Sequence, residues 1–267
     1  MDMPRNRFKH AMLSGKTPIG TWLVSGAPST AEAMGSAGFD FVVLDMEHTP
    51  IDMSELVGIL RTIEGTPAGV VTRVPWNDMV MVKRALDAGA QSLMFPFVQS
   101  AEEAKRAVSF TRYPPDGVRG VAAVHRASRQ GTVANYHQGA AAELCVIVQI
   151  ETLAALDALP AIAVVPGVDS LFIGPADLAA SMGHLGNFGH PDVQAKLAEG
   201  AAACRRAGKP VGIVGPNPEM VGKFIDYGFT WVAIASDLGM MVGRAQEWLA
   251  KVRGQAPAAD ARPAAAY

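Results

Sequence analysis

The stretch VIVQIETLAALDALPAIAVVPGVDSLFIGPAD, residues 146–177, decides the fold. Two short apolar runs, VIVQI and DSLFI, each give way to a loop that carries an acid. Glu151 directly follows the first run, and Asp177 comes four residues after the second. Apolar runs without polar alternation are typical of strands buried on both faces, as in a parallel sheet. If these strands are parallel neighbours, both carboxylates lie at one mouth of the sheet.

The same pattern of short apolar run and helical segment extends in both directions along the chain. Strands are predicted at residues 19–24, 39–44, 69–74, 92–95, 144–150, 170–173, 210–214 and 231–234. Helical patterns occur near residues 29–37, 52–63, 77–88, 100–110, 152–159, 191–207, 217–227 and 238–252. Eight such units in a chain of this length predict an α/β fold, a closed (β/α)₈ TIM barrel. An open doubly wound sheet is the alternative, but no GxGxxG follows the first strand.

The barrel is expected to form a single domain over residues 1–253, with a short helix at residues 4–14. Residues 112–142 are too long for a simple connection, so this segment is expected to cover the site or to contact another subunit. Residues 254–267 are rich in Ala and Pro and are predicted to be a disordered tail.

Composition narrows the possible partners and compartment. The chain has 267 residues, 49% hydrophobic and 18% charged, which favours a large buried core. A net charge of -2 without a basic block disfavours nucleic acid as a partner. The sequence has no apolar run long enough for a bilayer and no apolar leader, so we expect a cytoplasmic protein without membrane contact. Two cysteines, Cys145 and Cys204, make neither a disulfide framework nor a zinc site.

Glu151 and Asp177 are the candidate metal ligands. Two carboxylates without a nearby Cys or His favour a hard cation such as Mg²⁺ or Mn²⁺ over structural zinc. Two protein ligands leave coordination positions for a bidentate substrate and water. The alternative for each acid is a structural role, because an acid at this place can cap the helix that follows.

Other polar residues follow the predicted strands, where barrel enzymes place their catalytic groups. Arg73 can clamp a carboxylate or stabilise a developing oxyanion; the alternative is a salt bridge to an acid at the rim. His48, beside Asp45 and Glu47, can act as a general base; the alternative is a surface or satisfied core histidine. The remaining polar residues at strand ends are Gln149, Ser236 and Asp237.

No lysine ends a predicted strand at this face. A Schiff-base aldolase needs such a lysine. Carbonyl chemistry in this chain would therefore need a metal as its electron sink.

Six motifs, in order, resemble one known family. They are GFDFVVLDMEHTPID (38–52), TRVPWND (72–78), LDAGAQSLMFPFVQSAEEA (86–104), YPPDGVRG (113–120), VQIET (148–152) and GVDSLFIGPADLAASMG (167–183). Together with their surroundings, roughly residues 5–253, they resemble the HpcH/HpaI aldolase family. These are metal-dependent (class II) pyruvate aldolases, such as 4-hydroxy-2-oxoheptanedioate and 2-dehydro-3-deoxyglucarate aldolases.

The resemblance implies a carbon–carbon lyase that cleaves 4-hydroxy-2-oxo acids to pyruvate, or a related 2-oxo acid, and an aldehyde, reversibly. It implies that Glu151 and Asp177 hold Mg²⁺, Mn²⁺ or Co²⁺, that His48 is the catalytic base, and that Arg73 stabilises the enolate. A role in aromatic catabolism is a further expectation.

The resemblance also assigns residues that spacing alone does not. Gln149 and the backbone N–H of Ala176 resemble substrate contacts. Asp87 resembles an acid that raises the basicity of the histidine, although sequence position favours Asp45 for that task. Asp87 lies near the end of a predicted helix, on the wrong face of the barrel unless a neighbouring subunit supplies it.

The resemblance also implies a homohexamer, a trimer of dimers in which the last helix is exchanged between barrels.

Two other classes of function stay open at this point. One is another enolate enzyme on the same barrel, an oxaloacetate-type decarboxylase or a CoA-ester lyase. The other is a non-catalytic protein that binds keto acids.

Overall fold

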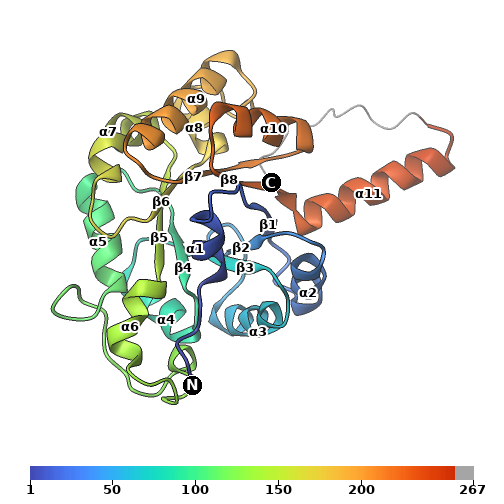
Figure 1. Ribbon diagram of the computed structural model, residues 1–267. Coiled ribbons are helices and arrows are strands. Elements are labelled where there is room, and N and C mark those ends of the chain that lie inside the picture. The colour runs from blue at the N-terminus through green and yellow to red at the C-terminus, as the bar shows by residue number, and fades with distance from the viewer. Residues whose placement is uncertain (256–267) are drawn as a thin grey trace.

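A computed structural model describes residues 1–255 of the chain, and its strands close into one parallel barrel (Figure 1). Each strand pairs with the next along the chain, and the last pairs with the first, so the open sheet is excluded. The strands are β1 (Ile19–Leu23), β2 (Phe41–Asp45), β3 (Gly69–Arg73), β4 (Ser92–Phe95), β5 (Cys145–Ile150), β6 (Ser170–Ile173), β7 (Val211–Gly215) and β8 (Trp231–Ser236). The predicted strands are confirmed, with ends that move by one or two residues.

Helices surround the barrel (Figure 1). They are α1 (Arg7–Met12), α2 (Pro28–Ser36), α3 (Met53–Glu64), α4 (Met79–Ala88), α5 (Ala101–Thr111), the 3₁₀ turn η1 (Arg126–Ser128), α6 (Tyr136–Glu143), α7 (Leu153–Ala163), α8 (Pro175–Ser181), α9 (Pro191–Arg206), α10 (Pro218–Tyr227) and α11 (Asp237–Val252). Helix α8 was not predicted, because a seven-residue segment that starts with Pro175 after a glycine looks like a loop in sequence.

Helix α1 closes the end of the barrel at which the strands begin. Its Phe8 is fully buried and meets the rings of Phe41 and Trp231 edge-on, with centroid distances of 5.0 and 5.2 Å. Asn6 caps this helix and also hydrogen-bonds Ser92 at the start of β4. With this end sealed by aromatic packing, the polar strand ends lie at the opposite end.

The segment 112–142 folds beside the barrel as η1 and α6. Val133, Tyr136 and Ala140 form a small apolar cluster separate from the main core, and Arg126 anchors η1 to the carbonyl of Ala88 at the end of α4. None of its residues lines the cavity at the C-terminal ends of the strands within the described chain. Covering the site is therefore not its role in a single subunit, and subunit contact stays a prediction.

Helix α11 projects away from the barrel (Figure 1). Asp237 is the buried residue at its start, while the helix exposes apolar side chains to solvent: Leu238, Met241, Val242, Trp248, Leu249 and Val252. An exposed apolar face of this size is typical of a surface that binds a partner. In the expected tail, Gly254 and Gln255 hydrogen-bond back to α11, and residues 256–267 lie outside the described part.

Cys145 and Cys204 are both free and buried, so no disulfide links them, as the sequence predicts. Burial raises the pKa of the Cys204 thiol to about 12 and raises that of Cys145 further. No helix in the described residues has the length and apolar character needed to cross a membrane.

We predict that Gly212 is required by packing inside the barrel. A Cβ at this position would lie 2.2 Å from the indole of Trp231, which is completely buried. Gly212→Ala should lower the free energy of unfolding by about 1–3 kcal/mol through overpacking. Gly222→Ala on α10 is the matched control, because its added methyl meets nothing within 4 Å. That control should be neutral or stabilising by up to ~1 kcal/mol. Equal stability of the two variants in denaturant unfolding would contradict the packing argument.

Candidate active site

The two candidate metal ligands do come together at the carboxyl ends of neighbouring strands. Ile150 of β5 pairs with Ile173 of β6, which sets Glu151 beside Gly174. A Cβ on Gly174 would lie 2.8 Å from the Glu151 carboxylate, so the acid packs directly over that backbone. Asp177 stands one turn further on, in the first turn of α8, and its charge raises the pKa of Glu151. The sequence prediction that the acids share one mouth is confirmed.

Neither acid caps the helix that follows it. The cap of α7 is Thr152, whose hydroxyl accepts from the backbone N–H of Ala155. The residue that precedes α8 is Gly174, which has no side chain to cap with. The alternative reading as N-caps is therefore wrong for Glu151 and Asp177, and both carboxylates are available for chemistry at the mouth.

Glu151 is held in a buried and strongly polar setting. It is 3% exposed, and one carboxylate oxygen accepts the backbone N–H of Phe97 at 2.6 Å. The other oxygen accepts the side-chain amide of Gln149. Burial, together with the charges of Asp177 and Glu47, raises the pKa of Glu151 to about 7, despite these two hydrogen bonds. A carboxylate crowded by like charges in this way is stabilised by a nearby cation.

Gln149 supplies a further oxygen at the same place. It is 2% exposed, and its amide nitrogen is engaged with Glu151. Its side-chain oxygen is buried and has no hydrogen-bond partner among the described residues. Buried amide oxygens are almost always satisfied in folded proteins, so an orphaned one at the rim of a cavity indicates a missing ligand or water.

Arg73, at the end of β3, is fixed by two acids and an aromatic ring. Its Nε donates to Asp45 at 2.8 Å, and its Nη1 lies 2.9 Å from Glu47. The guanidinium also sits over the ring of Trp22, 4.4 Å from the centroid. The alternative reading as a salt bridge to rim acids is thus confirmed, and it is compatible with a catalytic role. A guanidinium that is 3% exposed and held on two sides is preorganised for an anion.

Glu47 was expected from the sequence only as an acid beside His48, and it proves to be part of the site. Burial raises its pKa to about 7; the Arg73 guanidinium opposes this rise, and the charges of Asp45 and Asp177 add to it. It therefore lies within electrostatic reach of both Arg73 and the candidate metal ligands. The feature of the sequence that could have identified Glu47 is its position two residues after Asp45, at the end of β2.

His48 reaches the mouth from the loop after β2. Its side chain is 59% exposed, and its Nε2 lies 3.8 Å from the Glu47 carboxylate. It lines the cavity beside Arg73 and Asp177. An exposed imidazole next to an acid, with room to move, is suited to proton transfer with a bound molecule.

Asp87 does not reach this mouth within one subunit. It lies in the last turn of α4 and accepts from the guanidinium of Arg119 at 2.7 Å. Arg119 is completely buried and stacks on the ring of Tyr113. Asp45, the acid that sequence position favoured as the partner of His48, instead orients the Arg73 side chain and accepts from the backbone of Glu47.

A cavity of about 200 Å³ opens where these groups meet. Five predicted site residues line it: His48, Arg73, Gln149, Ala176 and Asp177. Sequence reasoning missed the other lining residues: Trp22, Phe172, Gly174, Pro175 and Val214. No polar pattern marks these, because an apolar strand residue that faces a cavity looks like any core residue.

A larger cavity, of about 560 Å³, opens at the opposite end of the barrel. Three of the arginines that line it are already engaged: Arg126 and Arg129 both pair with Glu64, and Arg7 donates to the carbonyls of Thr66 and Ala68. It contains no cluster of acids and lies at the end that barrels use for stability. The smaller cavity is therefore the candidate active site.

Comparison with known proteins agrees with this geometry. The family model for HpcH/HpaI aldolase/citrate lyase matches residues 18–243. The chain is 51% identical over 245 residues to the 2-dehydro-3,6-dideoxy-6-sulfogluconate aldolase of Pseudomonas putida, which covers 91% of this chain and 96% of that protein. It is 45% identical over 235 residues to the 5-keto-4-deoxy-D-glucarate aldolase of Salmonella arizonae, covering 88% and 92%.

The fold is also similar to solved structures of this family. A crystal structure of an HpcH/HpaI aldolase/citrate lyase family protein from Burkholderia cenocepacia is similar, with a TM-score of 0.90 and 40% identity. The match covers 93% of this chain and 99% of that one. Aldolase relatives at 45–51% identity over most of the chain make it a carbon–carbon lyase. On sequence, fold and coverage, the chain belongs to the HpcH/HpaI aldolase/citrate lyase family.

Proposed function

We propose that the chain cleaves 4-hydroxy-2-oxo acids to pyruvate and an aldehyde, and catalyses the reverse addition, with a divalent cation held by Glu151 and Asp177. The family is metal-dependent, and both relatives named above are aldolases. The single observation that carries the proposal is a small cavity lined by Asp177 and the fixed guanidinium of Arg73, with Glu151 directly after the neighbouring strand end.

The donor set fits a hard divalent cation. Glu151 and Asp177 offer carboxylate oxygens, and the buried side-chain oxygen of Gln149 lacks a partner among the described residues. Burial, with the charges of Asp177 and Glu47, raises the pKa of Glu151 to about 7. Oxygen donors of this kind suit Mg²⁺, Mn²⁺ or Co²⁺. When bound, such a cation acts as a Lewis acid that draws electrons from the keto group of the substrate.

The chain's own residues then divide the remaining work. His48 takes the proton of the C4 hydroxyl, the C3–C4 bond breaks, and its electron pair forms the C2–C3 double bond of an enolate while the aldehyde departs. Arg73, already oriented by Asp45 and Glu47, donates to the enolate oxygen. Protonation at C3 yields pyruvate. We place the substrate carboxylate near the first turn of α8, where Ala176 lines the cavity and could donate its backbone N–H.

The size of the cavity supports a small substrate. About 200 Å³ is below the usual range for drug-sized ligands, about 300–1,000 Å³. A short keto acid fits this space, whereas the pantetheine arm and nucleotide of a CoA ester would need a long groove.

The buried free thiols agree with the reducing environment of the cytoplasm. A role in aromatic catabolism stays a prediction.

The function is tested by pyruvate release coupled to lactate dehydrogenase. The substrates to assay are 2-dehydro-3,6-dideoxy-6-sulfogluconate, 5-keto-4-deoxy-D-glucarate and oxaloacetate. We expect the rate to fall at least about a hundredfold after EDTA and to return with Mg²⁺, Mn²⁺ or Co²⁺, since a Lewis acid contributes several kcal/mol.

In the same assay, Asp177→Asn should lose activity in a way that added metal does not restore at ordinary concentrations. Asp226→Asn, on α10 and away from the cavity lining, is the matched control and should behave like the wild type. Oxaloacetate turnover without any aldol cleavage would favour the decarboxylase. Binding of keto acids without product would show a non-catalytic protein.

Arg73 should stabilise mainly the transition state of the reaction and contribute little to substrate binding. We predict that Arg73→Lys lowers kcat by about 10²–10³, equivalent to roughly 3–4 kcal/mol, because an oxyanion donor is lost, while KM changes little. Lysine keeps a positive charge near Asp45, so the fold survives, and an unchanged melting temperature verifies this. Near-normal turnover of this variant would remove Arg73 from the reaction.

We further propose that Asp87 acts from a neighbouring subunit in a homohexamer. Asp87 is 25% exposed and is oriented by the buried Arg119, so its carboxylate can face a partner. The unpartnered apolar face of α11 supports exchange of this helix between barrels. The shared site would then explain why one subunit does not bring Asp87 to His48.

Assembly through α11 predicts a change in mass. Replacing Trp248 and Leu249, which are 61% and 50% exposed, with Glu and Lys should shift the particle to smaller oligomers in light scattering. The control is Lys251→Gln, whose side chain pairs only with Glu247 on the same helix. If the double variant keeps the mass of the wild type, α11 is not the exchanged element.

A further inference from the structure

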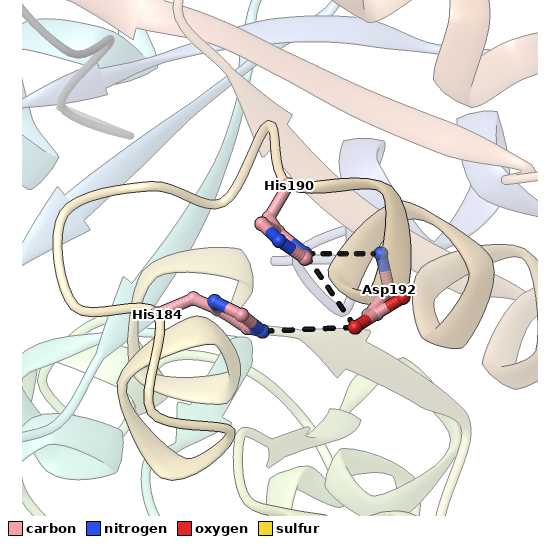
Figure 2. A group of neighbouring side chains, drawn as sticks. All are labelled: His184, His190 and Asp192. Carbon is pink, nitrogen blue, oxygen red and sulfur yellow. Dashed lines mark hydrogen bonds and ion pairs between the residues drawn. The ribbon is translucent and has the colours of Figure 1, made fainter.

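Away from the candidate active site, the described residues bring two histidines and an aspartate to a common point (Figure 2). His184 and His190 lie on the loop between α8 and α9, and Asp192 is in the first turn of α9. One ring nitrogen from each histidine and a carboxylate oxygen of Asp192 all lie within 4.8 Å of one another. None of the three lines the cavity at the barrel mouth.

The backbone fixes this arrangement. The N–H of His184 donates to the carbonyl of Ala179 at 2.8 Å, and its own carbonyl accepts from Asn187 at 2.9 Å. His190 donates in turn to Asn187 at 3.1 Å. These hydrogen bonds hold both ends of the loop. The two imidazoles therefore lie beside Asp192 in the folded chain.

The hydrogen bonds leave an electrostatic conflict at the centre of the group. The Nδ1 of His190 accepts the backbone N–H of Asp192 at 3.2 Å, so this nitrogen presents a lone pair rather than a proton. The same nitrogen lies 3.7 Å from a carboxylate oxygen of Asp192. The lone pair is directed at the backbone N–H, so this ring nitrogen gives no proton to the nearby carboxylate. The Nε2 of His184 lies 3.9 Å from that same oxygen. A cation among them would remove the conflict.

We propose that His184, His190 and Asp192 form a second metal site, selective for Zn²⁺, Co²⁺, Ni²⁺ or Cu²⁺. Imidazole nitrogens favour these ions over Mg²⁺ or Ca²⁺, which prefer all-oxygen ligands. In a tetrahedral site with bonds near 2.0–2.1 Å, neighbouring ligand atoms are about 3.4 Å apart. The contacts of 3.7 and 3.9 Å need to shorten by only a few tenths of an ångström.

One adjustment accompanies binding. The two rings now stack, with centroids 3.7 Å apart and planes at 16°, whereas a metal lies in the plane of each imidazole that binds it. One ring must therefore rotate out of the stack, and the Nδ1 of His190 must release the backbone N–H of Asp192, because this nitrogen has a single lone pair. Nothing buried is displaced, because the side chains of His184, His190 and Asp192 are 27%, 33% and 72% exposed. The bound ion would tie the loop to the start of α9.

The test is metal stoichiometry, which does not depend on turnover. Metal-stripped protein in excess Mg²⁺ is titrated with Zn²⁺ by calorimetry. We expect one Zn²⁺ per chain to be retained by the Glu151→Gln/Asp177→Asn double variant. His184→Ala should bind that ion at least about tenfold more weakly. His190→Asn removes the imidazole and keeps a good helix cap, so its loss of binding cannot come from a frayed helix.

Electron paramagnetic resonance of the Cu²⁺ form supplies a second readout. Two nitrogen ligands are expected in the wild type and one in His184→Ala or His190→Asn. His10→Gln is the control, because His10 pairs with Glu143 at the other end of the barrel. Equal Zn²⁺ affinity in the wild type and His184→Ala would show an adventitious ion only and overturn the proposal. Loss of all tight Zn²⁺ in the Glu151/Asp177 double variant would do the same.

Discussion

Burial of like charges at one end of the barrel is the constraint on which the site depends. Asp45, Glu47, Glu151 and Asp177 bring four carboxylates to the mouth, and Arg73 is the one guanidinium that contacts them among the described residues. Burial, with the neighbouring carboxylates, raises the pKa of Glu47 and Glu151 to about 7, so the folded chain alone disfavours their ionised forms. A bound divalent cation would supply the missing positive charge, so the fold and the need for a metal follow from the same arrangement.

The Arg73 side chain is fixed by the residues that surround it at the mouth. Asp45 and Glu47 hold it from β2, and Trp22 supports its flat face from β1. The side chain is therefore fixed before a substrate arrives, and little reorganisation is needed when charge develops on an enolate oxygen. The salt bridge is therefore compatible with the catalytic role proposed for this residue.

The barrel has a polarity that separates stability from function. At the end where the strands begin, α1 and a cluster of aromatic rings fill the interior. At the other end, short turns between strand and helix leave acids, an amide and an imidazole around a small cavity. Two features stay incomplete in a single chain: the apolar face of α11 and the distance of Asp87 from His48. Both motivate the proposal that neighbouring subunits complete the site.

The sequence by itself determined the barrel and most of its mouth. Strand–helix alternation is a local property, and in a parallel barrel every strand carries its last residues to the same end, so Glu151, Asp177, Arg73 and His48 were predictable. Only the tertiary structure decided that Asp45 orients Arg73, that Glu47 shares the site, and that Trp22, Phe172 and Val214 line the cavity. Those facts depend on which side chains face inward at a common height, and this is set by strand register and packing across the barrel, which no local pattern encodes.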